Sequence, residues 1–229
     1  TSEVLQTLTD TDRFSNGGYK FNLTPTQGNI LGTMDGAEHM RWRRIFQKIF
    51  LPQHIKSWGA TIVEPIVHEL IDRFLPRGEA DLIEEFTLRY PFEVIYRQLG
   101  LPERDVRTFQ RLAIALTDYV NSDKAFEARD KLGDYFRELI EHRRANPGPD
   151  LISLLARTEV DGEYLPEDVF ISFLRQLMNA GGDTTYRSTS VLLTALLQNP
   201  DQMEAVRADR SLVGSAIEEA LRWDGPVLV

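Results

Sequence analysis

The chain contains no cysteine among its 229 residues. This absence excludes disulfides, thiolate zinc sites, iron–sulfur clusters and cysteine nucleophiles within these residues. No run approaches the roughly 18 uninterrupted apolar residues that span a bilayer, and Thr1-Ser2-Glu3 does not begin a signal peptide. We therefore expect a soluble, cytoplasmic protein with no membrane partner.

Basic charge is also scarce, since 26 basic residues stand against 35 acidic ones and the formal net charge is −9. The acidic residues are spread along the chain, so the charge gives no support for a nucleic-acid partner. Hydrophobic residues make up 42% of the chain, which is an ordinary globular proportion and enough for one sizeable core. We expect a single domain over residues 1–229.

Sustained alternation of apolar and polar residues is missing as well, whereas apolar residues recur at helical spacing over most of the chain. The predicted fold class is therefore mostly α. Bends are expected at Pro65 and Pro91, which lie inside helical patterns. Proline, glycine and capping residues place the predicted helices at about 2–8, 38–50, 53–74, 81–99, 103–120, 123–144, 151–157, 166–199, 201–208 and 211–223.

Two connections differ from ordinary helix–helix turns. The stretch 9–37, rich in glycine and proline, predicts a long loop of the kind that often carries function. Asp161-Gly162 predicts a tight turn between two very short strands.

The longest predicted helix has an unusual centre, in which Gly181 and Gly182 precede Asp183 and Thr184. Each glycine costs a helix about 1 kcal/mol relative to alanine, so the pair needs a reason. Adjacent glycines let a flat group or another backbone approach closely, and a threonine hydroxyl can bond the carbonyl one turn back and open the ladder to water. A crossing of two helices through small residues explains the spacing equally well.

Two other pairs of residues share helix faces. His39 and Arg43 are four residues apart, with Phe46 further along the same face, and together they suit an anionic group on an apolar ring system. Taken alone, a solvated histidine–arginine pair is the simpler interpretation. Glu219 and Arg222 form a Glu-x-x-Arg pair, which normally means an exposed ion pair.

The remaining patterns predict no metal site and no hydrolase site. His68-Glu69-Leu70-Ile71-Asp72 lacks the second histidine of a metalloprotease helix. No glycine-rich phosphate loop precedes a helix, and no serine triad can be argued.

In their order along the chain, these motifs resemble those of the cytochrome P450 haem-thiolate monooxygenases, particularly the soluble bacterial kind. Residues 4–15 resemble the family's B helix and its exit, and 35–44 resemble the entry to its C helix. Residues 180–185 resemble the oxygen-activation motif of its I helix, and 218–227 its K helix and the turn after it. The resemblance covers nearly the whole chain. It implies the helical part of the P450 fold, from the B helix to just after the K helix.

The resemblance also implies roles for the two central motifs. Asp183 and Thr184 would be catalytic, because they would deliver protons through ordered water to dioxygen. The histidine and arginine of the C-helix motif would hold the propionates of haem b, and the small residues of the I-helix motif would leave room over its face. The residues implied to bind the cofactor are His39, Arg43, Ala180, Gly181 and Gly182.

Other positions receive structural or binding roles by the same resemblance. Glu219 and Arg222 would be structural, and Val227 would line the substrate pocket together with 17–34 and 116–122. The substrate would be a small apolar organic molecule. The cationic outer face of the C-helix segment would dock a ferredoxin-type electron donor.

The chain departs from the family in one decisive way. The family's iron ligand is a cysteine in a glycine-rich loop beyond the Glu-x-x-Arg helix, and the chain reaches Val229 without one. The thiolate favours O–O cleavage, so we expect this chain alone to be inactive. The expected intact enzyme inserts one oxygen atom of O2 into its substrate. This chain would be a fragment of it that lacks the N-terminal sheet and the C-terminal haem-ligand loop. Apolar surface left uncovered would lead to self-association. The alternatives are a haem-free helical binding or interaction module derived from that fold, and the helical ligand-sensing domain of a regulator.

Overall fold

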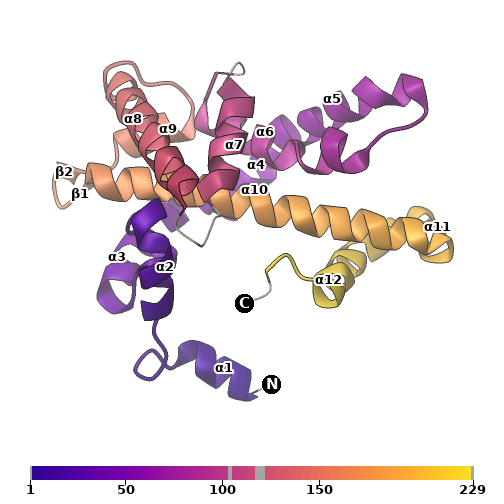
Figure 1. The fold of residues 1–229 in the computed structure, drawn as a ribbon, viewed down its shortest axis with the longest axis horizontal. Helices are drawn as coiled ribbons and strands as arrows, with labels where there is room; N and C mark the ends of the chain where they lie inside the picture. Colours follow the sequence, from indigo (N-terminus) through magenta and orange to yellow (C-terminus); the bar gives the residue numbers. More distant parts are fainter. Residues whose placement is uncertain (1, 103–104, 117–121, 228–229) are drawn as a thin grey trace.

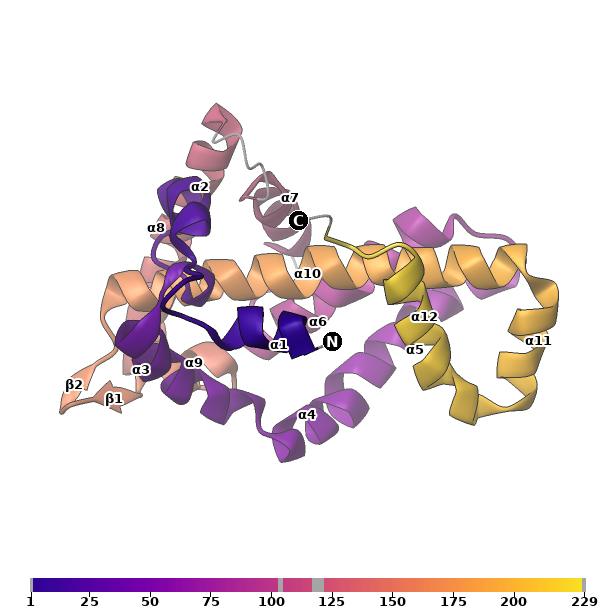
Figure 2. The same ribbon diagram turned by 90° about the horizontal axis from the view of Figure 1, so that it is seen from below.

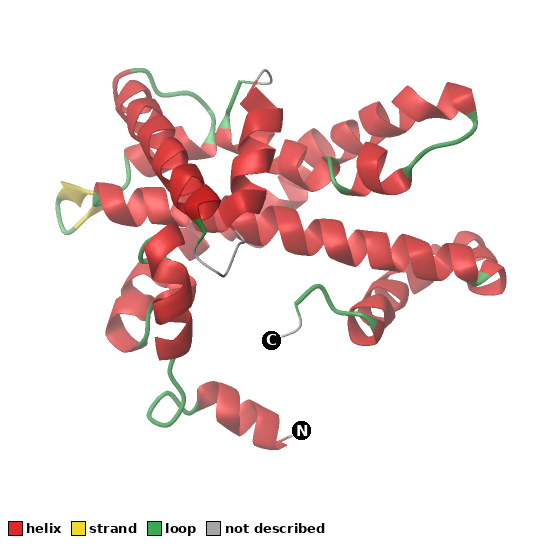
Figure 3. Cartoon of the chain, viewed as in Figure 1, coloured by secondary structure: helices red, strands yellow, loops and turns green. Residues whose placement is uncertain are grey.

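The computed structural model describes residues 2–102, 105–116 and 122–227, and most of them are helical (Figures 1 and 3). The mostly α class is thereby confirmed. None of the described helices is long and apolar enough to cross a membrane. The α-helices are α1 (Ser2–Thr9), α2 (Gly17–Gln27), α3 (Gly36–Gln47), α4 (Pro52–Trp58), α5 (Glu64–Phe74), α6 (Tyr90–Leu99), α7 (Val106–Leu116), α8 (Asp123–Ala145), α9 (Leu151–Ala156), α10 (Glu167–Gln198), α11 (Pro200–Ala208) and α12 (Val213–Trp223).

Two of the predicted helices are divided by π-helical turns. Gly59–Val63 separates α4 from α5, directly before Pro65. Proline has no N–H and its ring clashes with the carbonyl four residues back, so the irregularity expected at Pro65 falls on the turn before it. Likewise Ile83–Thr87 precedes α6, and Pro91 lies in the first turn of α6 rather than inside a helix. Short 3-10 turns follow at Leu31–Thr33, Lys48–Phe50, Leu75–Arg77 and Arg210–Leu212.

The long loop predicted between the first two helices is wrong, because α2 occupies much of it. Contacts distant in sequence hold this helix in place despite its glycines and Pro25. The Asn16 backbone N–H donates to the Asp35 carboxylate at 3.1 Å, and the Arg129 guanidinium of α8 donates to the Pro25 carbonyl at 3.0 Å. Tertiary hydrogen bonds therefore override the low helix propensity of the segment.

The helix α10 runs through the whole molecule, with the β1–β2 hairpin at one end and α11 and α12 at the other (Figures 1 and 2). It has 32 residues, in agreement with the predicted long helix. At 1.5 Å per residue it is about 48 Å long. Its first half packs on α6, α7 and α8, and on α3 through the stacked rings of Phe46 and Phe173, whose centroids are 3.8 Å apart. The main core is therefore built around one end of α10.

The hairpin before α10 confirms the predicted turn. Strands β1 (Glu159–Val160) and β2 (Glu163–Tyr164) pair antiparallel. Asp161 and Gly162 between them both have positive φ, 57° and 87°. Two successive positive φ values are characteristic of the type I′ turn that Asp-Gly favours.

Candidate functional site

A cavity of about 820 Å³ lies between α2, α3 and α10, with the segment after α12 on one side. Its volume is within the range of about 300–1,000 Å³ that small-molecule sites occupy. One face of α10 forms a wall, because the lining residues of this helix recur every three or four positions. The lining residues are Asn16, Tyr19, Leu23, Gln27, Ile30, Leu31, Gly32, His39, Arg43, Gln176, Asn179, Ala180, Asp183, Thr184, Arg187, Pro226 and Val227.

The two donors predicted on the basic helix both reach this cavity. His39 and Arg43 lie one turn apart on α3 and line it. Among the residues that the structure describes, neither side chain has a hydrogen-bond or ion-pair partner. These donors are therefore available to an anionic group inside the cavity. A solvated pair on an outer helix face would not be placed to bind such a group.

The acid and the hydroxyl of α10 line the opposite wall. Thr184 donates its hydroxyl to the Ala180 carbonyl at 2.7 Å, which is the bond to the previous turn that the sequence predicted. α10 nevertheless stays α-helical through these residues, so the expected opening of its ladder is not seen there. The Asp183 carboxylate accepts from Arg187 Nε at 2.8 Å, and its side chain is 21% exposed. Both functional groups thus have partners on their own helix.

The two glycines turn toward α6. A Cβ at Gly182 would lie 2.4 Å from a ring carbon of Phe92, and one at Gly181 would lie 2.9 Å from the Ile95 side chain. Real Cβ atoms do not approach so closely, so Gly182 must be glycine for α6 and α10 to pack as they do, whereas at Gly181 a small shift of the Ile95 side-chain end would relieve the contact. The helix crossing through small residues explains the pair, and its role beside a haem stays a prediction.

The Glu-x-x-Arg pair of α12 lies outside the cavity. Arg222 donates Nε and Nη2 to the two carboxylate oxygens of Glu219, each at 2.7 Å. This hydrogen bonding lowers the pKa of Glu219 and raises the pKa of Arg222. The exposed ion pair predicted from spacing is confirmed, and its structural role stays a prediction.

Of the predicted substrate-binding segments, only part lines the cavity. Residues of 17–34 and Val227 line it as expected. In 116–122, residues 117–121 lie outside the described residues, Leu116 is buried in the core, and Ser122 caps α8 through a bond from the Ala125 N–H at 3.3 Å.

Two polar lining residues of α10 were missed from the sequence. Gln176 accepts the Leu31 N–H at 3.0 Å, and Arg187 holds Asp183. A signal was present, since 176, 180, 183 and 187 follow one face of a helix. Gln27, which is 2% exposed, lies in the predicted segment 17–34 but was not singled out within it.

Comparison with known proteins gives the family. No family model matches the chain. Cytochrome P450 107B1 of Saccharopolyspora erythraea is 33% identical over 204 residues, which are 89% of this chain and 50% of that protein. Vitamin D3 dihydroxylase of Streptomyces griseolus is 36% identical over 83% of this chain and 47% of its own length. The solved structure of the cytochrome P450 enzyme CxnD, for C–S bond formation in chuangxinmycin biosynthesis, superposes with a TM-score of 0.82 at 31% identity, covering 93% of this chain and 55% of that one.

The chain belongs to the cytochrome P450 family. It spans about half the length of the P450 relatives it matches, and its helices correspond to the helical part of the P450 fold. The cavity therefore lies between α3, which contains the motif that resembles the family's C helix, and α10, which contains the motif that resembles its I helix. The predicted family and fold are both confirmed.

Proposed function

We propose that the full-length P450 containing this chain is a haem-thiolate monooxygenase that inserts one oxygen atom of O2 into a small organic substrate. The observation that carries the proposal is the cavity, which gathers His39, Arg43, Asp183 and Thr184 from two helices far apart in sequence. Spacing placed His39 and Arg43 on one helix face, the glycine motif singled out Asp183 and Thr184, and the fold brings the two pairs to one cavity.

The residues present fit a haem as far as this chain contributes to its site. Two unpartnered donors on α3 suit the carboxylates of the propionates, and Ala180 gives the α10 wall a small apolar surface. No described group of histidine, aspartate and glutamate residues could hold a metal ion by itself, so the iron would arrive within its macrocycle. When ligated by a thiolate, that group supplies dioxygen activation, and electron donation by the thiolate favours O–O cleavage.

Proton transfer is the part that Asp183 and Thr184 would perform. The hydroxyl proton of Thr184 is directed to the Ala180 carbonyl, so its oxygen can accept a hydrogen bond from a water in the cavity. The Asp183 carboxylate accepts from Arg187 through Oδ2, and its second oxygen would exchange a proton with that water. Arg187 would thus hold the acid in place until a water reaches it.

The cavity wall also bears on the substrate. Leu23, Ile30 and Val227 offer apolar surface, as expected for an apolar organic substrate, while Gln27 and Asn179 add hydrogen-bonding groups. We infer a substrate with an apolar body and at least one polar substituent. A ferredoxin-type donor docking on the cationic face of α3 and a cytoplasmic location belong to the same proposal.

The decisive test compares neighbouring threonines in the full-length protein, whose reading frame is expected to continue to a single cysteine ligand. Thr184→Ala and Asp183→Asn should each lower the rate of product formation by roughly 100-fold, the size of a lost acid–base step, and should lower the yield of product per O2 consumed. Thr185→Ala is the matched control, because Thr185 lies outside the cavity, between α10 and α12. It should leave the yield unchanged.

Two results would count against the proposal. Equal losses in the Thr184 and Thr185 variants would remove the role of the cavity hydroxyl. A full-length protein that takes up no haem would instead support the haem-free binding module. The chain of 229 residues by itself should give no thiolate-type carbon monoxide spectrum with added haemin, since it has no cysteine.

A further inference from the structure

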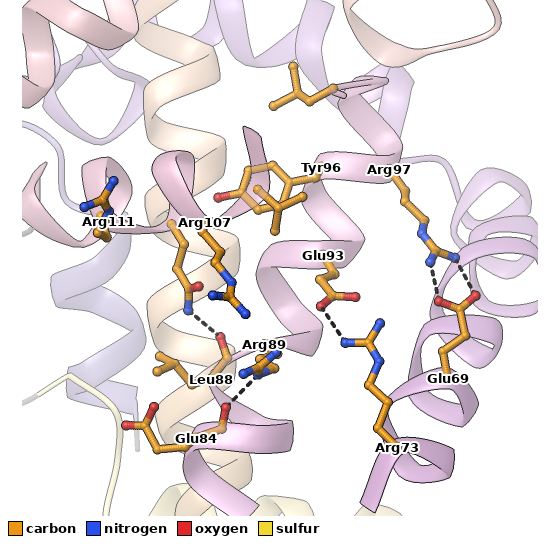
Figure 4. Close-up of a pocket in the computed structure, with 13 residues that line it drawn as sticks. Glu69, Arg73, Glu84, Leu88, Arg89, Glu93, Tyr96, Arg97, Arg107 and Arg111 are labelled. Atoms are coloured by element: carbon orange, nitrogen blue, oxygen red, sulfur yellow. Dashed lines mark hydrogen bonds and ion pairs between the residues drawn. The ribbon is translucent and has the colours of Figure 1, made fainter. Parts of the chain in front are cut away.

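A second cavity, of about 680 Å³, lies between α5, α6 and α7 (Figure 4). Its wall is unusually rich in arginine for a chain whose net charge is −9. We call it the arginine cavity. It is lined by Glu69, Arg73, Glu84, Leu88, Arg89, Glu93, Tyr96, Arg97, Leu101, Val106, Arg107, Gln110 and Arg111.

Two of these arginines are neutralised by carboxylates at one side of the cavity. Arg97 donates to both carboxylate oxygens of Glu69, at 3.3 and 2.5 Å. Arg73 approaches the Glu93 carboxylate at 3.9 Å. Figure 4 shows both pairs between α5 and α6. The acidic groups of the wall are therefore largely committed to these two residues.

The other three arginines are not neutralised in this way. Arg89 donates Nε to the backbone carbonyl of Glu84 at 2.8 Å, and it attracts Glu85 and Glu93 only through space, without an ion pair among the described residues. Arg107 and Arg111 follow one another by a turn on α7, and within the described residues neither they nor Arg89 form an ion pair with a carboxylate. Glu84 is the remaining carboxylate of the wall, so one negative charge faces the three guanidinium groups of Arg89, Arg107 and Arg111. Like charges gathered in a concave surface attract an anion strongly.

A buried hydroxyl gives a second, independent sign of a ligand. Tyr96 is 2% exposed, and its hydroxyl has no hydrogen-bond partner. Burial raises the pKa of Tyr96, so the hydroxyl keeps its proton and remains a donor. Figure 4 shows the hydroxyl end of the ring turned toward α7, the helix that carries Arg107. Buried polar groups normally have a hydrogen-bond partner, so we expect a ligand with an acceptor atom to bind beside this hydroxyl.

We propose that the arginine cavity binds a phosphoryl dianion, either inorganic phosphate or the phosphate monoester of a larger molecule. Guanidinium groups match phosphate oxygens with paired donors. The positive charge of three arginines that form no ion pair within the described residues is larger than the single negative charge of a carboxylate ligand. It suits a dianion with several acceptor oxygens. The Tyr96 hydroxyl would donate to one of these oxygens. All four groups come from α6, its preceding turn and α7, so the site needs no assembly from distant segments.

Calorimetric titration of the full-length protein with inorganic phosphate, at constant ionic strength, tests the proposal. We expect saturable binding that weakens at least tenfold in Arg107→Gln/Arg111→Gln and several-fold in Tyr96→Phe. Arg207→Gln/Arg210→Gln removes the same charge from two exposed arginines near α11 and should bind phosphate like the parent. Circular dichroism of each variant checks that the fold is kept.

The outcome separates the two sources of the phosphoryl group. Phenyl phosphate binding at least tenfold more tightly than inorganic phosphate would assign the site to a monoester, and similar affinities would assign it to the free ion. The absence of saturable binding by either probe would overturn the proposal. So would equal weakening in the two double variants, because the effect would then be one of total charge.

Discussion

The two halves of α10 belong to one helix but are packed in different ways. In the first half all residues from Val169 to Leu174 are buried, together with Met178. After Gly182, no described residue of α10 is buried, and α12, which packs on that half, buries only Ala220. The main core cluster accordingly ends at Met178.

Two hydroxyl–hydroxyl hydrogen bonds join the second half to α6 and to the π-helical turn before it. Thr87 and Ser190 are joined by a hydroxyl–hydroxyl bond of 2.7 Å, and Tyr90 and Thr189 by another of 2.7 Å. One helix can thus pack in the hydrophobic core at one end and form interhelical hydrogen bonds between hydroxyl groups at the other. Apolar side chains remain exposed around the second half, which supports the self-association predicted from the sequence; they include Leu197, Leu212, Ile217, Leu221 and Trp223.

The largest contrast is expected from truncating leucines in the two halves. Leu174 is 0% exposed and Leu197 is 59% exposed. Leu174→Ala should lower the free energy of unfolding by about 2–5 kcal/mol, since it removes buried contacts and leaves a cavity. Leu197→Ala should change it by less than about 0.5 kcal/mol. Urea denaturation of both variants measures the difference, and equal losses would show that the second half is buried after all.

Glycine substitutions should give effects of opposite sign. A Cβ at Gly182 would meet the Phe92 ring, so Gly182→Ala should destabilise the protein by about 1–3 kcal/mol through overpacking. No atom lies within 4 Å of a Cβ at Gly214 in α12. Gly214→Ala should therefore stabilise the protein by roughly 0.5 kcal/mol, because it restricts the unfolded chain. Thermal unfolding checks both, and a stabilising Gly182→Ala would contradict the tight crossing with α6.

The smallest expected effect is a difference in pH dependence. Burial raises the pKa of Glu93 in α6 above its usual 4.5, whereas the hydrogen bonds from Arg222 lower the pKa of Glu219 in α12. Ionised Glu93 opposes folding, so the parent should gain stability relative to Glu93→Gln as the pH falls from neutrality toward 4.5. Ionised Glu219 favours folding, and that contribution should be lost relative to Glu219→Gln below pH 4.5.

Unfolding midpoints between pH 7 and pH 3 would resolve the two trends. Glu219 and Arg222 are exposed, so solvent screens their attraction and the effect should be the smaller one. Parallel curves for the two variants would mean that burial and ion pairing do not differ between these regions.

The sequence was informative wherever the signal is local. The long period of α10, with Asn199-Pro200 after it, predicted a helix that the structure confirms almost to the residue. Asp161-Gly162 predicted its turn for the same reason. α2 was missed because its glycines and Pro25 oppose a helix, while the bonds that fix it come from Asp35 and Arg129, far along the chain.

The same limit applies to the candidate site. Helical spacing placed His39 beside Arg43, the glycine pair drew attention to Asp183 and Thr184, and the family resemblance joined the two pairs. The pairing of Asp183 with Arg187 was visible as an i, i+4 spacing but was not used. The arginine cavity could not be predicted, because its residues come from three helices whose relative placement no local pattern encodes.

The position of α10 in the chain also governs the order in which the protein can assemble during synthesis. Phe92 and Leu99 are made long before Phe170 and Leu174, which belong to the same core cluster. At about 5–20 residues per second, the early helices wait for several seconds with their apolar faces uncovered. Until α10 leaves the ribosome, those faces are open to chaperones and to neighbouring nascent chains.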